Sequence, residues 1–213
     1  MKQPELPVTV YAESTPNPAT MKFVANKLLI ENGETAEYTS SETATESALV
    51  SQLFGFPFVT GIFIAGNFIS VTKNSMVEWM EVTPELREHI KEYLTHHTLF
   101  SKEGKRQATD SAKKKIVQPI SRDILPGGQA DPGSTYTETE KRIVGILEEY
   151  VRPAVEQDGG AIHFKSFENG TLTVVLRGSC SGCPSSAFTL KAGIQGLFQK
   201  ILPEVKEVVS EEE

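Results

Sequence analysis

The chain lacks the features that mark several large classes of protein. It has only two cysteines and one tryptophan in 213 residues. Two cysteines are too few for the disulfide framework of a small secreted domain. Its first residues, MKQPELPVTVYAE, contain no basic segment followed by an apolar run, and no stretch approaches the roughly 18 apolar residues of a membrane-spanning helix. We therefore expect a cytoplasmic protein that is neither secreted nor inserted in a membrane.

An excess of basic residues is also missing. The formal net charge is −7 at pH 7, with 38% apolar and 23% charged residues, which is typical of a soluble globular protein. A protein that coats nucleic acid needs a dense basic face, so no nucleic-acid partner is expected. The sequence also offers no Ser-His-Asp array, no phosphate-binding glycine loop and no convincing pair of acids. None of these patterns therefore suggests a catalyst.

Residues 1–100 show the regular apolar periodicity of an α+β domain. VTVYAE and MKFVAN predict two strands joined by the turn-rich STPNPAT. Two β-branched and aromatic runs flank Gly66 and Asn67, a pair that suits a tight hairpin. Helices are predicted over 41–53 and from Thr83, with Thr83 as N-cap and Pro84 at the first helical position. The apolar stripe of the second helix comprises Leu86, Ile90, Tyr93 and Leu94.

Residues 101–135 lose this periodicity and predict a flexible, basic linker between two domains. LPGGQADPGST has the glycine- and proline-rich composition of a connector. Seven basic residues precede it: Lys102, Lys105, Arg106, Lys113, Lys114, Lys115 and Arg122. We interpret the charge run as a solvated segment. A docking strip for an acidic partner is the alternative, because KIVQPISRDIL carries enough apolar side chains to order on contact.

Residues 136–213 predict a second small α+β domain. Thr137 and Glu140 have the spacing of a capping box. The helix that follows should be kinked at Pro153, which cannot donate a backbone hydrogen bond, and should stop at Gly159 and Gly160.

The rest of this domain is predicted as a hairpin, a helix and a strand. AIHFKSF and TLTVVLRG are alternating strands around Asn169 and Gly170, and Pro184 opens a helix. The apolar face of that helix comprises Ala187, Leu190, Ile194, Leu197, Phe198 and Ile201. VKEVV closes the domain as a strand and the last glutamates form a solvated tail. The order is helix, strand, strand, helix, strand.

Both cysteines lie in GSCSGCPSS, residues 178–186, between a predicted strand and a predicted helix. Cys183 directly precedes Pro184, where helix-end amides and the helix dipole favour an anion, and so favour thiolate. Gly178 and Gly182 leave room around the sulfurs. Hydroxyls that could donate hydrogen bonds to sulfur belong to Ser179, Ser181 and Ser185. We expect a site that holds negatively charged sulfur near the surface.

The spacing alone leaves three kinds of site open. A thiol-disulfide oxidoreductase also uses Cys-x-x-Cys, although here the motif follows a hairpin late in the chain instead of an early βαβ unit. Structural zinc and an iron-sulfur cluster both normally take four ligands, so either would need a second chain. His163 is the nearest histidine in sequence, and we interpret it as an ordinary residue of a strand face.

Several motifs resemble one known family. Residues 151–208 resemble the C-terminal domain of NifU-like proteins, the Nfu family of iron-sulfur cluster scaffolds and carriers, through RPAV, DGG, GSCSGCPSS and the spacing of Leu190 to Val205. The first half resembles the N-terminal domain of the same family through STPNPATMKFV and, more loosely, GIFIAGNFISVTK. The resemblance covers most of the chain and leaves the connector without a counterpart.

The resemblance implies a non-enzymatic carrier. Cys180 and Cys183 of each chain would supply half of the ligands to one 4Fe-4S cluster bridging a homodimer, and a 2Fe-2S form stays open. The cluster would be received from upstream assembly machinery and passed to apo iron-sulfur proteins. The N-terminal domain would recognise clients or partner machinery. A thiol redox enzyme and a zinc-bridged structural dimer remain the alternatives.

Overall fold

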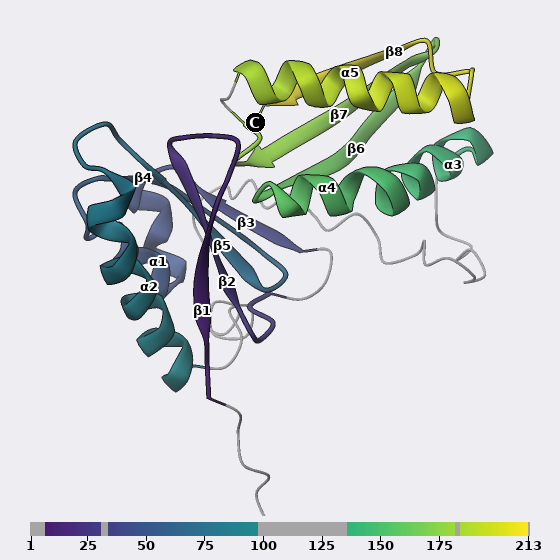
Figure 1. Ribbon diagram of the computed structural model, residues 1–213. Coiled ribbons are helices and arrows are strands. Elements are labelled where there is room, and N and C mark those ends of the chain that lie inside the picture. The colour runs from purple at the N-terminus through teal and green to yellow at the C-terminus, as the bar shows by residue number, and fades with distance from the viewer. Residues whose placement is uncertain (1–6, 31–33, 98–135, 182–183, 213) are drawn as a thin grey trace, which may run out of the picture. The chain divides into compact units, whose positions relative to one another are not determined.

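The structure is a computed structural model that describes residues 7–30, 34–97, 136–181 and 184–212. These residues form two compact units, one before and one after residues 98–135 in the sequence, and Figure 1 shows the elements of each. The prediction of two α+β domains is confirmed. The connector predicted over 101–135 lies outside the described residues, so its flexibility and the domain boundaries stay predictions. Within the described part, no helix is both long and apolar enough to cross a membrane.

The N-terminal unit is a five-stranded antiparallel sheet with helices on one face (Figure 1). Its strands lie in the order β1-β2-β5-β4-β3. Their bounds are β1 Val10–Ser14, β2 Thr20–Ala25, β3 Thr35–Tyr38, β4 Val59–Ala65 and β5 Phe68–Lys73. Phe23, Ile62 and Ile69 of three adjacent strands are buried in one core with Leu49 and Leu86 of the helices. Alternate residues of each strand therefore face the helices.

The predicted hairpin around Gly66 and Asn67 is confirmed. Strands β4 and β5 pair from Ala65↔Phe68 onwards, and Gly66 has a φ of 49°, a conformation that suits glycine. The two strands predicted before it are also present as β1 and β2. Strand β3 was not predicted, because TAEY is only four residues long and has a weak apolar pattern.

Both helix predictions in this unit need correction. The helix predicted over 41–53 is divided into a 3-10 turn, Ser41–Glu46, and α1, Ala48–Leu53, with the Ser47 side chain accepting a hydrogen bond from the Val50 amide. Helix α2 spans Trp79–His96, so Thr83 and Pro84 lie inside it instead of starting it. A capping box between Glu78 and Glu81 satisfies the first amides. The predicted stripe holds, since Leu86, Ile90 and Leu94 are buried.

The C-terminal unit confirms the order helix, strand, strand, helix, strand. Its elements are α3 Glu138–Ile146, the π-helical turn η3 Leu147–Val151, α4 Arg152–Gln157, β6 Gly160–Glu168, β7 Thr171–Gly178, α5 Pro184–Ile201 and β8 Glu207–Glu212. The sheet order is β6-β7-β8, with β6 antiparallel and β8 parallel to the central β7. Its core joins residues of α3, α4, α5 and the sheet, which include Ile143, Val155, Leu172, Phe198 and Val208.

Local signals explain most of these boundaries. The capping box of Thr137 and Glu140 is present. Before Pro153 the Arg152 amide bonds to the Leu147 carbonyl, five residues back, so the helix widens where proline cannot donate. Asn169 and Gly170 turn the hairpin with φ values of 52° and 88°.

Two predictions at the end of the chain are wrong. The glutamates predicted as a solvated tail continue β8 to Glu212, because the strand pairs in parallel with β7 from Thr171↔Glu207 to Leu176↔Glu212. Ile201, predicted on the buried face of α5, is 41% exposed at the last turn. The side chain of Ala187 lies outside the description.

Candidate functional site

The cysteine loop joins the end of β7 to the start of α5. Gly178 ends the strand with a φ of 67°. The Ser181 amide and hydroxyl both donate to the Gly178 carbonyl, at 3.1 and 2.8 Å. Residues 178–181 therefore form a closed turn that contains Cys180. Cys183 lies outside the described residues, so the structure does not place it.

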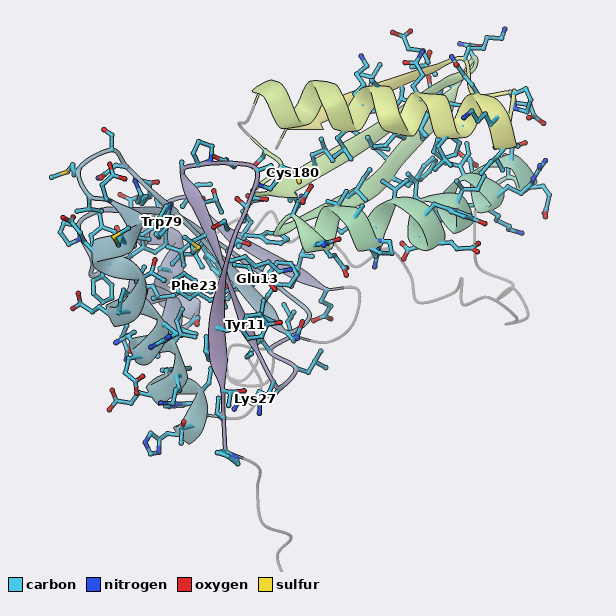
Figure 2. The ribbon with its side chains drawn as sticks, viewed as in Figure 1. Tyr11, Glu13, Phe23, Lys27, Trp79 and Cys180 are labelled. Carbon is cyan, nitrogen blue, oxygen red and sulfur yellow. The ribbon has the colours of Figure 1, made fainter. Side chains whose placement is uncertain are left out.

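Cys180 is buried. Its side chain is 3% exposed and belongs to the apolar core of the C-terminal unit. Figure 2 labels the residue at the end of β7. The expectation of sulfur held near the surface is wrong for this cysteine, because the turn directs its side chain into the core. The linear spacing of the motif contains no information on that direction.

The sulfur of Cys180 lies against a glycine of a different element. A Cβ atom built on Gly160 would be 2.7 Å from Cys180 Sγ and 2.6 Å from the Arg177 carbonyl oxygen. Gly160 begins β6 and pairs with Gly178 across the sheet. The absence of a side chain at residue 160 therefore makes the space that the thiol occupies.

The role of Gly160 was missed from the sequence, which assigned the glycine pair only to ending a helix. That assignment holds for Gly159, which follows α4 with a φ of 81°. Glycine within a strand often marks close approach of another group, so a second glycine that belongs to β6 could have signalled the contact.

Two of the serine hydroxyls that were expected to donate hydrogen bonds to sulfur donate to backbone carbonyls instead. The Ser179 hydroxyl donates to the Asp158 carbonyl, and the Ser179 amide donates to the Gly159 carbonyl at 3.3 Å. Ser179 Oγ is 3.9 Å from Cys180 Sγ, which allows a weak contact at most. The prediction is wrong for Ser181, whose hydroxyl bonds a carbonyl, and the side chain of Ser185 lies outside the description.

These contacts join the loop to the turn between α4 and β6. Asp158 and Gly159 accept hydrogen bonds from Ser179, and Gly160 contacts Cys180. We call residues 158–160 the glycine turn. Its contacts with Ser179 and Cys180 determine where the thiol of Cys180 points.

The described residues form no other concentration of metal-binding side chains. Among them, no three or more His, Cys, Asp or Glu residues gather in a way that could hold a metal ion. His163 lies on β6 and pairs in register with Val175. Neighbouring Ile162 and Phe164 point into the core, so His163 is on the face of the sheet turned away from the helices.

Comparison with known proteins identifies the family. Residues 10–97 match the family described as "Scaffold protein Nfu/NifU N terminal", and residues 143–209 match the "NifU-like domain". The human "NFU1 iron-sulfur cluster scaffold homolog, mitochondrial" is 31% identical over 204 residues, which cover 93% of this chain and 70% of the human protein. The chain belongs to the Nfu family of iron-sulfur cluster scaffold proteins. The predicted family is thus confirmed.

Other Nfu relatives match at similar levels. The protein of the same name from Drosophila sechellia is 30% identical over 199 residues, covering 93% of this chain and 63% of the relative. The chain thus spans about 63% of the length of that relative. A solution NMR structure of a NifU-like protein from Saccharomyces cerevisiae aligns with 48% of this chain and 93% of its own, at 22% identity and a TM-score of 0.41.

Proposed function

We propose that this Nfu-family chain carries an iron-sulfur cluster as cargo and delivers it to apo iron-sulfur proteins. The observation that supports this most is the place of both cysteines in the sequence, where they form one Cys-x-x-Cys motif between the end of β7 and the start of α5 in the NifU-like domain. A loop at the end of a strand can present sulfur to a cluster without rearranging the sheet. The carrier needs no catalytic group of its own.

The cargo is a 4Fe-4S cluster shared by two copies of the chain. Such clusters are normally held by four thiolates, and each chain supplies two, Cys180 and Cys183. A cluster at an interface can be released by loosening that interface, whereas a closed four-cysteine site within one chain would retain it. A 2Fe-2S cluster bound by the same four thiolates is the second form that this site would accept.

The N-terminal unit recognises clients or the upstream machinery that supplies the cluster. It contains no cysteine, so it contributes no thiolate ligand. The relatives in the comparison are named mitochondrial, whereas the composition of this chain led to a cytoplasmic expectation, which stays a prediction.

Replacing the proposed ligands tests the cargo site. Cys180→Ser and Cys183→Ser should each abolish the cluster and the dimer that depends on it, because serine oxygen is a poor ligand for cluster iron. Ser166→Ala, on β6, is the matched control and should keep both. Brown colour after anaerobic reconstitution, iron content and sedimentation report the result. A normal cluster in either cysteine variant would refute the ligand assignment.

Deleting residues 1–100 tests the role of the N-terminal unit. The shortened chain should assemble the cluster normally and transfer it more slowly to at least some apoproteins. Transfer rates are measured by the recovery of client activity or by circular dichroism of the transferred cluster. Unchanged rates to every client tested would contradict a recognition role.

A further inference from the structure

The burial of Cys180 conflicts with its proposed task unless the residue moves. A ligand of a cluster shared by two chains must reach the surface of its own chain. Cys180 is only 3% exposed and packs in the core of the C-terminal unit. The described position of its sulfur is therefore not the position that binds cargo.

We propose that the Cys180 thiol exchanges between a stowed position against Gly160 and an outward position that binds the cluster, and that Gly160 and Ser179 set the balance. This inference rests on the proposed function. Both residues act as positioning residues, since they direct the thiol without being ligands themselves. The turn at 178–181 is the element that moves.

Gly160 provides the stowed position. The Cys180 sulfur occupies the volume where a side chain at residue 160 would start, since an added Cβ would lie 2.7 Å from Sγ. Any residue larger than glycine would compete with the thiol for that volume. The Cβ would also lie 2.6 Å from the Arg177 carbonyl oxygen, so the end of β7 would have to shift as well.

Ser179 holds the turn in the stowed arrangement through two hydrogen bonds, which we call the latch. Its hydroxyl donates to the Asp158 carbonyl and its amide donates to the Gly159 carbonyl. Turning Cys180 outward strains or breaks these bonds. A hydrogen bond of this kind changes a two-state equilibrium by up to about tenfold.

Stowing the thiol weakens cargo binding, because the apparent affinity is the intrinsic affinity multiplied by the fraction of chains that hold Cys180 outward. Such a loss suits a carrier, which must release what it holds. It also withdraws one thiol of the cluster-free chain from solvent.

Thiol alkylation of the metal-free chain tests the stowed position directly. In the Cys183→Ser background Cys180 is the only thiol, and its alkylation rate by N-ethylmaleimide is compared between native buffer and concentrated guanidinium chloride. An outward state populated at roughly 0.1–10% predicts native alkylation slower by roughly 10- to 1,000-fold. Equal rates would overturn the proposal.

Two further variants test the positioning residues. Ser179→Ala should speed native alkylation by up to about tenfold. Gly160→Ala should speed alkylation further, because its Cβ would lie 2.7 Å from the stowed sulfur. Gly145→Ala is the control, since a Cβ there meets nothing within 4 Å. If Gly160→Ala does not fold by circular dichroism, Ser179→Ala alone decides, with Ser166→Ala as its control. An alkylation rate that Ser179→Ala leaves unchanged would overturn the role of the latch.

Release of the cluster separates positioning from simple destabilisation. With Cys183 restored, Ser179→Ala should lose its cluster to a chelator more slowly than the unmodified chain, since a larger outward fraction raises affinity. Faster release would contradict the proposal. A failure of the unmodified chain to bind iron and sulfide at all would instead refute the proposed function, and the alkylation rates of the metal-free chain would still report on the stowed thiol.

Discussion

The two units of this chain share a helix-on-sheet arrangement but differ in sheet topology and in what their polar side chains contact. Each packs helices against a single face of a sheet around its own apolar core. In the N-terminal unit, polar side chains join structural elements. Trp79 Nε1 donates to the Pro18 carbonyl at 2.9 Å, and Lys27 Nζ donates to the carbonyls of Leu94 and His97 at the end of α2.

In the C-terminal unit, polar contacts also surround a cysteine. Ser179 is bonded to the turn that precedes β6, and Gly160 makes the space for the sulfur. The comparison teaches that a sheet covered by helices around an apolar core does not by itself make a functional site. The difference lies in one loop, at the point where a strand ends, a helix begins and a glycine turn lies alongside.

The largest effect should come from breaking one core and leaving the other. Phe198 is fully buried in the C-terminal core, so Phe198→Ala should destabilise that unit by about 3–5 kcal/mol and remove cluster binding. Hydrogen exchange followed by mass spectrometry on the full chain reports each unit separately. Phe23→Ala should give the reverse pattern, because Phe23 belongs to the N-terminal core. Loss of protection in both units of either variant would show that the cores are not independent.

A smaller effect on stability is expected from removing the hydrogen bonds of Lys27 in the N-terminal unit. Lys27→Met removes a cation that bonds two carbonyls at the end of α2, and it should destabilise this unit by about 1–2 kcal/mol. Cluster content should not change. Urea unfolding followed by Trp79 fluorescence measures the effect.

The control for this variant is Lys91→Met. Lys91 is a surface lysine of α2 that forms an ion pair with Glu88 at 2.9 Å. Its replacement should cost less than about 0.5 kcal/mol. An equal cost for the two variants would contradict the special role of Lys27.

The smallest effect concerns pH and the C-terminal unit. Burial raises the pKa of Glu148 above its ordinary value of 4.5. The guanidinium of Arg152, whose Nη2 lies 2.5 Å from Glu148 Oε1, partly offsets this rise, and the negative charge of Glu156 adds to it. Because the folded state holds this proton more tightly, the contribution to stability is fully present below pH 4.5 and is lost as pH rises through the folded pKa.

Glu148→Gln should therefore flatten the dependence of unfolding free energy on pH just above 4.5. The matched control is Glu138→Gln, the same change at an exposed side chain of α3. Urea unfolding at a series of pH values measures both. A curve for Glu148→Gln with the same slope as the unmodified chain would contradict the prediction.

Local signals made much of the fold predictable. Some features depend only on residues that are close together in the sequence, so a short stretch of sequence is enough to predict them. They are the turn at Gly66, the turn at Asn169 and Gly170, and the capping box at Thr137. The start of α2 was missed because Thr83 and Pro84 imitate a helix start, whereas the helix begins earlier with a Glu78 and Glu81 capping box. Strand β3 exists through pairing with β4, which short-range patterns do not contain.

The family was predictable from the sequence, whereas the assignment of Cys180 and Cys183 as ligands stays a prediction and the geometry around Cys180 could not be predicted. The motif identified the two thiols and the family, since spacing and flanking residues are properties of the sequence. The direction of Cys180 and the contact with Gly160 depend on the pairing of β6 with β7, which brings together residues 20 positions apart. A side chain's direction within a turn is decided by such tertiary contacts.

The most direct test of the carrier function is the content of iron, acid-labile sulfide and zinc in the anaerobically reconstituted chain, with mass by light scattering on the same sample. The account predicts four irons and four sulfides per two chains, in a dimer that separates when the cluster is removed. A colourless protein with one zinc per dimer, or a metal-free monomer that cycles between dithiol and disulfide, would contradict it.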